Sequence, residues 1–485
     1  MRSLAFLSVL LIGPAAAQAV PPLPTPEAIA GDAAMKVSEA QLRRDIEKLV
    51  SFGTRHTLSS QTDPKRGIGA ALNWTEAELR RYARACGGCL QVGRTSQVME
   101  GRRLPGPTRI TNVFAIQRGT ERPNDVVIIT GHIDSRVSDV MDAVKDAPGA
   151  NDDGSGTAAV IEAARVLSKT RFPGTIVYAA LSGEEQGLYG GKVMADYAKA
   201  QGWNVIANLN NDIIGNSCGS DGVCNARQVR VFSEGPRWQG REDLAARQRS
   251  LGGENDSPSR NLSRFLDSLA DRHPQIGLDV MQVWRNDRFG RGGDHTEFLN
   301  AGFPAVRFSV AVENYHHQHQ DLRVENGIEY GDTIDKMDFP YLTKVVKLNV
   351  AALATLAMAP PPPEPMVEGA VSTDTTVRWA RVPGARSYVV RWRRTDANRW
   401  EHQEVVRHDA SAEAEMVRQI QANAAPGEVV HAHISGYQKI LKGVRVDDWV
   451  FGVSSVAANG AESPVASAVP GGAFKPYVAP PPAGQ

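Results

Sequence analysis

The sequence has no excess of charge of either sign, few cysteines and no long apolar run after its N-terminus. The 485 residues carry 54 Lys and Arg against 54 Asp and Glu, so the formal net charge is zero. Without net charge a protein has no overall attraction to nucleic acid or to anionic membranes. A membrane-spanning helix needs roughly 18 or more consecutive apolar residues, and we find no such run. We therefore expect neither a nucleic-acid partner nor a membrane span.

The N-terminus is typical of a targeting segment. Residues 1–19, MRSLAFLSVLLIGPAAAQA, contain one Arg, then a short apolar stretch, then small residues. Ala15-Ala16-Ala17 fits the small-x-small pattern of signal-peptide cleavage sites, and Ala17-Gln18-Ala19 is an alternative. No Cys follows these sites, so a lipid anchor is not indicated. The segment predicts a secreted or periplasmic protein.

The four cysteines agree with an oxidising compartment. They form two local pairs, Cys86 with Cys89 and Cys218 with Cys224. Such a compartment favours short-loop disulfides. A CxxC redox site normally needs a thioredoxin-like unit, which the surrounding sequence lacks, and the spacing between the pairs is long and irregular for a four-cysteine zinc site. We predict two structural disulfides.

Composition and periodicity divide the rest of the chain. After a Pro-rich segment, 20–35, residues 36–358 alternate strand and helix patterns. This alternation predicts an α/β domain whose mostly parallel central sheet is covered by helices. A Pro-rich linker, 359–365, precedes residues 366–470, where apolar and polar residues alternate with period two and predict a β-sandwich. A Pro/Gly/Ala-rich tail occupies 471–485.

Side chains that can bind metal follow successive predicted strands. Ligands of open α/β sheets bind at the carboxyl ends of the strands, so these side chains are expected to meet. Each alone has an ordinary interpretation, such as a helix N-cap or a solvated surface group. Their coincidence in a region otherwise rich in Val, Ile, Leu and Ala favours a site where cations offset the carboxylates. The residues are His132, Asp134, Asp152, Asp153, Glu184, Glu185, Asp212, His316, His317, His319 and Asp321.

The order of these motifs resembles the dizinc exopeptidase family, which includes secreted aminopeptidases, glutamate carboxypeptidases and glutaminyl cyclases. The matching stretches, over roughly residues 40–358, are HID, GANDDGSG, LSGEEQGLYG, NLNNDIIG and a late His. The resemblance implies two Zn²⁺ ions. His132 and Asp212 would bind one, Glu185 and a late His the other, and Asp152 would bridge them.

The same resemblance implies roles for neighbouring residues. Glu184 would be the general base, and Asp134 would orient the first zinc-binding His. The peptide bond between Asp152 and Asp153 would be cis. The segment GGDHTEF, residues 292–298, is similar to a family segment that lines the substrate pocket, which implies that Asp294 and His295 lie there.

The last zinc ligand is open to three histidines. The family places an acidic residue four positions after this ligand, and that spacing to Asp321 selects His317. His316 and His319 are the alternatives.

The resemblance implies an enzyme that hydrolyses peptide bonds, and we expect an aminopeptidase that acts on the N-terminal residues of peptides. The alternatives are a carboxypeptidase, a glutaminyl cyclase and a non-catalytic receptor-like binding protein. A carboxypeptidase would need a cationic clamp for the terminal carboxylate. Candidates are Arg285, Arg288, Arg291 and Arg307, although solvated surface is the simpler interpretation for most of them.

The C-terminal segment resembles a fibronectin type III sandwich of about a hundred residues. The matching features are Trp379 on an early strand, Tyr388 on the next, and the late stretch VFGVSSVAANGAESP. The sandwich is a candidate for contact with cell wall, polysaccharide or protein.

Overall fold

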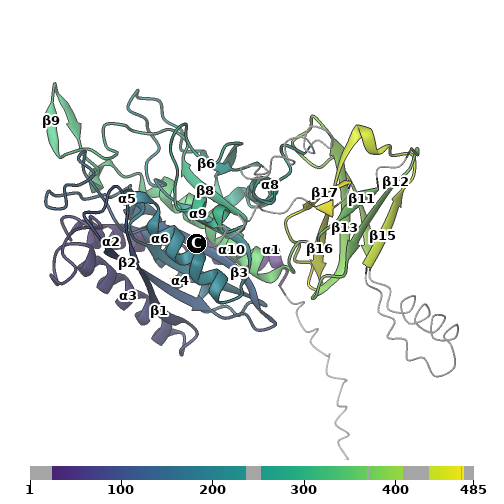
Figure 1. Cartoon of the computed structure of the whole chain (residues 1–485), viewed down its shortest axis with the longest axis horizontal. Helices are drawn as coiled ribbons and strands as arrows, with labels where there is room; N and C mark the ends of the chain where they lie inside the picture. The colour runs from purple at the N-terminus through teal and green to yellow at the C-terminus, as the bar shows by residue number, and fades with distance from the viewer. Residues whose placement is uncertain (1–23, 236–252, 369–370, 408–435, 471, 474–485) are drawn as a thin grey trace, which may run out of the picture.

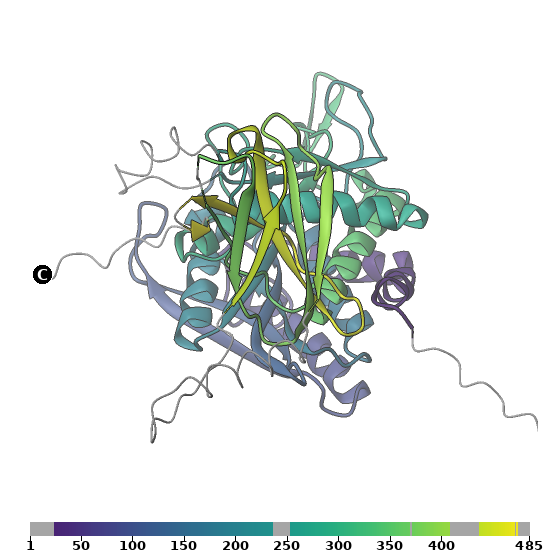
Figure 2. The same ribbon diagram turned by 90° about the vertical axis from the view of Figure 1, so that its right-hand side faces the viewer.

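The computed structural model describes residues 24–235, 253–368, 371–407, 436–470 and 472–473. The predicted signal peptide and nearly all of the C-terminal tail lie outside these residues. The described residues form an α/β body and a smaller β domain that lie side by side (Figure 1). Seen from the side of the β domain, its strands stand in front of the α/β body (Figure 2).

An eight-stranded mixed sheet runs through the α/β body, in the order β1-β2-β4-β3-β5-β8-β6-β7. The neighbours β4, β3, β5 and β8 are parallel, as predicted, while β1, β2 and β6 pair antiparallel with the strand nearer the centre. Every residue of β4 is buried, as expected for a strand covered on both faces. The strands are β1 Gln91–Met99, β2 Thr108–Gln117, β3 Arg122–His132, β4 Gly174–Leu181, β5 Asn204–Asn211, β6 Gln228–Ser233, β7 Asp279–Val283 and β8 Ala305–Val310.

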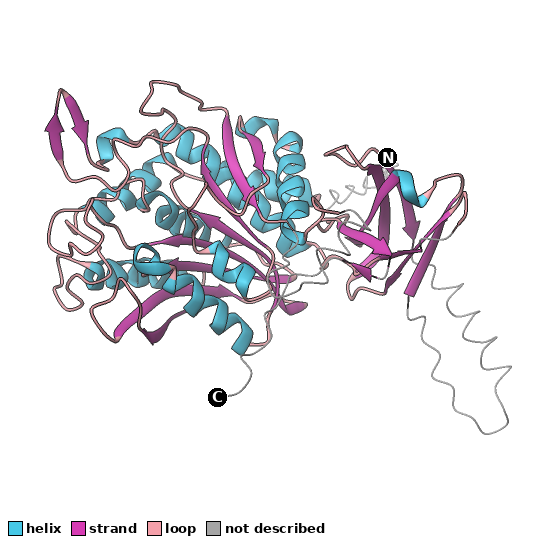
Figure 3. Ribbon diagram, turned by 45° about the horizontal axis from the view of Figure 1, so that its top comes forward, coloured by secondary structure: helices cyan, strands magenta, loops and turns pink. Residues whose placement is uncertain are grey.

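Helices cover both faces of this sheet (Figure 3). The apolar side chains of one face form the larger core with α1 Pro26–Met35, α2 Glu39–Val50, α3 Ile68–Ala85, α4 Gly154–Leu167, α8 Pro258–Arg272 and α10 Phe339–Met358. Those of the other face pack against α6 Tyr189–Ala200 and α9 His295–Asn300. The one-turn helix α5 Glu184–Gly187 follows β4, and β9 Arg323–Glu325 pairs with β10 Ile328–Tyr330 in a small hairpin (Figure 1).

Helix α1 lies in a segment that the sequence marked only as Pro-rich, and helix α10 lies in the core of the α/β body. The N-terminal segment 20–35 was separated from the catalytic domain, but Pro26–Met35 is helix α1, capped by Thr25 and packed on α10. Small residues at Ala30, Ala33 and Ala34 are buried and allow this close packing. Helix α10 is long and apolar enough to cross a membrane, but 89% of its apolar stretch is buried inside the molecule. It is the central helix of the larger core.

Both predicted disulfides are present. Cys86 and Cys89 are joined just after α3, and Cys218 and Cys224 close a loop after β5. All four cysteines of the chain are therefore paired.

The C-terminal domain is a nearly closed β structure with strand order β14-β13-β16-β17-β11-β12-β15. Trp379 and Tyr388 are buried in its core, with the Trp379 ring stacked on Tyr437. The predicted all-β architecture is thus confirmed, and the fibronectin type III assignment stays a prediction. The strands are β11 Met366–Glu368, β12 Thr375–Ala380, β13 Ala385–Arg394, β14 His402–Arg407, β15 Gly436–Leu441, β16 Trp449–Ala457, β17 Ala466–Pro470 and β18 Gly472–Ala473.

The two domains are joined through α8 as well as through the linker. The buried Arg393 of β13 lies 2.6 Å from the buried Asp256, just before α8. Asn261 of α8 donates to Ser467 Oγ at 2.9 Å, and Arg264 donates to the carbonyl of Asn398 at 2.9 Å. These contacts make the β domain part of a continuous packed structure.

Candidate metal centre

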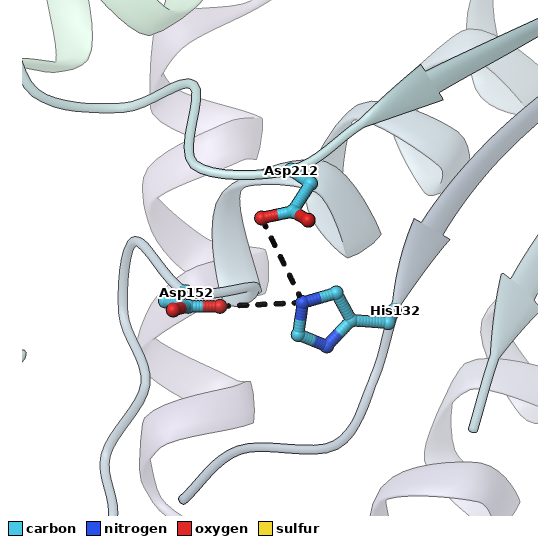
Figure 4. Close-up of side chains that lie close together, drawn as sticks. All are labelled: His132, Asp152 and Asp212. Carbon is cyan, nitrogen blue, oxygen red and sulfur yellow. Dashed lines mark ion pairs between the residues drawn. The ribbon is translucent and has the colours of Figure 1, made fainter. Parts of the chain in front are cut away.

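Three candidate ligands converge at the carboxyl ends of the parallel strands. His132 is the last residue of β3, Asp212 directly follows β5, and Asp152 lies in the turn before α4. His132 Nε2 is 3.2 Å from Asp152 Oδ1 and 3.9 Å from Asp212 Oδ1 (Figure 4). All three side chains are buried. Parallel strands that end at one edge of the sheet thus bring together residues that lie far apart in the sequence.

Asp152 also faces a second group. Its Oδ2 lies 2.8 Å from Nε2 of His319, and that nitrogen is 2.9 Å from Glu185 Oε1. Each carboxylate oxygen of Asp152 therefore faces a different histidine. Within each group the nitrogen and oxygen atoms that could bind a metal lie within 4.8 Å of one another.

The residues present fit two neighbouring cations. Glu185 Oε1 is buried and accepts no well-directed hydrogen bond from the described residues, although His319 lies close. A buried carboxylate oxygen without a donor is unfavourable unless a cation shares it. Imidazole nitrogen and carboxylate oxygen are ordinary zinc ligands, and a shared Asp152 would place two ions side by side.

The structure brings His319, and not the predicted His317, to this cluster. The ring of His316 packs on Tyr330 instead, with centroids 5.3 Å apart. His319 adopts a left-handed backbone conformation, with φ of 54°, in the turn after β8. The spacing rule failed because the Asp321 carboxylate accepts from the Ser138 N–H and pairs with Lys145, so among its described contacts it orients no late histidine.

Asp134 is held beside both halves of the cluster. Its carboxylate accepts hydrogen bonds from Thr57 Oγ1 at 2.9 Å and from the backbone N–H groups of Glu184 and Glu185 at 3.3 and 3.1 Å. Its Oδ1 lies 3.6 Å from His132 Nδ1, while its backbone oxygen is closer to that nitrogen, at 3.0 Å. Asp134 thus ties the end of β3 to the two adjacent glutamates.

The turn that carries Asp152 is held in place by hydrogen bonds from neighbouring segments. The bond between Asp152 and Asp153 is cis, as the resemblance implied. Asp153 caps α4 and also accepts from the His132 N–H at 2.9 Å. Asp332 accepts from the Asp152 N–H at 2.7 Å, and the buried Arg55 donates to the Gly149 carbonyl at 2.8 Å. No motif in the sequence pointed to Asp332 or Arg55, because both act through contacts with residues far away in the chain.

Glu184 lines a cavity of about 600 Å³ that opens above the cluster. Burial raises the pKa of its carboxyl group well above the usual value; the nearby His132 charge opposes this rise, and Glu185 and Asp212 add to it. No described hydrogen bond or ion pair engages the Glu184 side chain. The Glu184 carboxylate, unlike that of Glu185, therefore has no hydrogen-bond or ion-pair partner among the described residues, and it lines the cavity.

The comparisons with known proteins agree with this arrangement. The family model described as Peptidase family M28 matches residues 112–333. A probable zinc metalloprotease of Leptosphaeria maculans is 46% identical over 382 residues, which are 78% of this chain and 88% of that protein. The chain belongs to peptidase family M28. A probable zinc metalloprotease of Pyrenophora teres f. teres is 42% identical over 436 residues, 88% of this chain and 84% of that protein.

Solved structures that resemble this M28 member do so at low identity. The LapA aminopeptidase of Legionella pneumophila has a TM-score of 0.48 at 19% identity and covers 68% of this chain and 75% of its own. An aminopeptidase from Aneurinibacillus sp. strain AM-1 has a TM-score of 0.46 at 15% identity, covering 68% and 96%.

The predicted pocket residues of this M28 member, Asp294 and His295, are buried and are not among the residues that line the cavity. Asp294 Oδ1 accepts from the Gly191 N–H at 2.8 Å, while its buried Oδ2 has no described partner. Burial raises the pKa of Asp294 to about 7. His295 Nε2 lies 2.8 Å from the Asn286 carbonyl. The described hydrogen bonds of both residues are thus made with backbone groups of the protein, away from the cavity lining.

Arg307 is a site residue whose position the sequence did not reveal. It was a candidate clamp for substrate, but it is fully buried on β8. Its Nη2 lies 2.9 Å from Asp212 Oδ1, and its Nη1 donates to both oxygens of Asp287 at 2.6 and 2.7 Å. A planar guanidinium with two anchored ends fixes the orientation of Asp212.

Proposed function

We propose that this M28 protein is a zinc-dependent exopeptidase that hydrolyses short peptides with two Zn²⁺ ions. The observation that carries the proposal is the shared Asp152, whose oxygens face His132 on one side and His319 on the other. The names of the M28 relatives, probable zinc metalloproteases, support zinc and peptide-bond hydrolysis. In this proposal His132, Asp152 and Asp212 hold one ion, and Asp152, Glu185 and His319 hold the other.

Glu184 is the proton carrier of the proposed reaction. When bound, two zinc ions supply Lewis-acid activation of a water molecule and of the scissile carbonyl. The Glu184 carboxylate takes the proton of the attacking water and then delivers it to the leaving amine. Asp134 positions this carboxylate, because it accepts hydrogen bonds from the backbone N–H groups of both Glu184 and Glu185. The adjacent glutamates thus divide the work between metal binding and proton transfer.

Either end of the peptide substrate is a candidate for the residue that is removed. The aminopeptidase expected from the sequence is the first. The second, removal of a C-terminal residue, is favoured by the arginines that line the cavity, among them Arg288 and Arg291. Arg285 is exposed and is not among the lining residues, and Arg307 is buried away from substrate, so neither serves as a clamp.

Blocked peptides test the proposal directly. Zinc-loaded protein is incubated with a pentapeptide in three forms: free, N-acetylated and C-amidated. Mass spectrometry then shows which end shortens. Two zinc ions per chain by metal analysis and shortening from one end only are expected. Internal cleavage, or full activity after complete removal of zinc, would contradict the proposal.

We also propose that the protein is secreted or periplasmic. The segment 1–19 supports this proposal through its signal-like composition. Mass spectrometry of the mature N-terminus tests it, with a start at residue 18 or 20 expected. A mature protein that retains Met1 would contradict it.

A further inference from the structure

Arginines dominate the charged wall of the cavity. Five of them line it, Arg102, Arg103, Arg136, Arg288 and Arg291, and no lysine does. The acidic lining residues are Asp152, Glu184, Glu185 and Asp212, all of which belong to the proposed metal centre or serve as its base. The cavity therefore has cationic side chains that the proposed chemistry does not use.

Two of the five arginines form ion pairs with carboxylates of the protein. Arg136 lies 2.8 Å from Glu185 Oε2, and Arg288 pairs with Asp287 at 3.1 Å and with Glu313 at 3.2 Å. Arg102, Arg103 and Arg291 make no ion pair with any carboxylate in the described part of the chain. These three, which we call the free arginines, come from two separate segments: the loop between β1 and β2, and the loop before α9.

Two of the free arginines reach positions next to the proposed metal ligands. Arg103 Nη1 donates to the backbone carbonyl of Glu185 at 2.8 Å. Arg291 Nη2 lies 3.3 Å from the side-chain amide of Gln318, in the amide orientation that satisfies its neighbours. Gln318 directly precedes His319. Both guanidinium groups thus approach the half of the centre formed by Glu185 and His319.

We propose that the free arginines form a subsite for a carboxylate carried by a residue that adjoins the scissile bond. The inference rests on the proposed function, because two Zn²⁺ ions would offset the four carboxylates of the cavity, and the free arginines have no carboxylate partner of their own among the described residues. Guanidinium groups bind carboxylates through paired hydrogen bonds, and a concave site strengthens the attraction. The substrates are therefore anionic near the bond that is cut.

The carboxylate has two sources that use the same chemistry: the C-terminal carboxylate of a short peptide, or an Asp or Glu side chain. Three substrates separate them: the dipeptide Leu-Leu with a free carboxylate, its C-terminal amide, and Leu-Glu amide. We expect kcat/KM for at least one of the two carboxylate substrates to exceed that of Leu-Leu amide by about 10-fold or more at low salt. The ratio of kcat/KM for the carboxylate substrate to kcat/KM for Leu-Leu amide should fall at about 0.5 M salt, because salt screens the surface charges. Equal kcat/KM on all three substrates would overturn the subsite.

Measurements of peptide binding separate a failure of the subsite proposal from a failure of the proposed function. Zinc-loaded Glu184→Gln protein is titrated calorimetrically with the same three peptides. Tighter binding of a carboxylate peptide than of Leu-Leu amide supports the subsite even if the native protein cleaves none of them, in which case only the proposed function fails. Equal affinities overturn the subsite even if the native protein cleaves all three.

Substitutions locate the subsite. Arg103→Gln and Arg291→Gln should each lower the ratio of carboxylate to amide affinity about tenfold, with zinc content unchanged. Arg285→Gln is the matched control, because Arg285 is exposed on the segment that carries Arg291 and does not line the cavity. A ratio that stays constant in both variants, or falls as much in the control, would overturn the assignment.

Discussion

At the scale of single residues, the candidate centre depends on the division of labour between neighbouring side chains. Asp152 turns its two oxygens to different histidines, an arrangement that would let one carboxylate bind both cations of the proposed centre. Glu184 and Glu185 are adjacent, but only Glu185 is held by other side chains, through Arg136 and His319. The two adjacent glutamates therefore differ in their surroundings, since Glu185 is paired with other side chains and Glu184 lines the cavity.

The glutamate pair gives the first prediction. Glu184→Gln should lower kcat by at least about 10²–10⁴-fold while both zinc ions stay bound, since an amide cannot accept a proton from water. Glu185→Gln should instead lower zinc affinity, since an amide oxygen is a weaker ligand. Peptide turnover and zinc content by metal analysis measure the two effects. Zinc loss in Glu184→Gln with full occupancy in Glu185→Gln would mean that the roles are exchanged.

The late histidines give the second prediction. His319→Ala should lower zinc content toward one ion per chain, because His319 alone of the three reaches Asp152 and Glu185. His316→Ala and His317→Ala are controls from the same turn and should keep two. Dialysis against limiting zinc followed by metal analysis makes the comparison. Equal zinc content in all three variants would contradict the arrangement.

Arg307 gives the third prediction. Arg307→Met leaves Asp287 buried without its main partner and should destabilise the protein by about 3–5 kcal/mol. The double variant Arg307→Met/Asp287→Asn removes both charges and should recover part of that loss. Denaturant midpoints measure stability, and zinc titration measures the positioning of Asp212. If both variants bind zinc as tightly as the native protein, Arg307 does not position the ligand.

At the scale of elements, the helices on the larger core carry polar groups that link stability to pH. Asp45 of α2 is buried and accepts from Gln41 Nε2 at 2.7 Å, with Glu162 of α4 adding repulsion. Burial raises its pKa to about 7. The folded state thus holds a proton that the unfolded state releases near pH 4, so this group makes the protein less stable as pH rises from about 4 to 7.

Asp45→Asn tests this linkage. The variant cannot ionise, so its stability relative to the native protein should increase between pH 4 and pH 8, by up to about 4 kcal/mol. Both proteins are unfolded with denaturant in the presence of a chelator, so that zinc binding adds no pH dependence. Glu47→Gln, at an exposed position of the same helix, is the control. A stability difference that is constant with pH would contradict the prediction.

At the scale of the whole molecule, the β domain is coupled to the α/β body more tightly than a Pro-rich linker suggests. Arg122 donates to the Ala359 carbonyl at 2.8 Å, so the start of the linker is itself bound to the α/β body. The buried pair of Arg393 and Asp256 crosses the interface. Every proposed zinc ligand nevertheless precedes residue 320. The domain interface therefore bears on stability rather than on metal binding.

The matched pair Arg393→Met and Arg394→Met tests this coupling. Loss of Arg393 leaves Asp256 buried without its main ion pair and should cost about 3–5 kcal/mol, while loss of the exposed Arg394 should change stability by about 0.5 kcal/mol or less. Thermal unfolding measures both, and zinc content should stay at the native value. Equal midpoints for the two variants would show that the interface pair is not important for stability.

The sequence by itself determined the features that local patterns encode. Alternating strands and helices specified the sheet, and the end of each parallel strand marked His132, Glu185 and Asp212, because strand ends meet at one edge wherever the sheet forms. The cysteine pairs lie a few residues apart, so their bonding was also a local matter. Such features follow from periodicity and short spacing, which a sequence displays directly.

Only the tertiary structure decided which groups meet across long separations. Spacing selected His317, but the turn after β8 presents His319, because Asp321 is engaged by Ser138 and Lys145 from a distant loop. From the sequence, a solvated surface position was the simpler interpretation for Arg307, but in the structure Arg307 is buried beside Asp212. No periodicity records these contacts, since they depend on how segments more than 90 residues apart pack against each other.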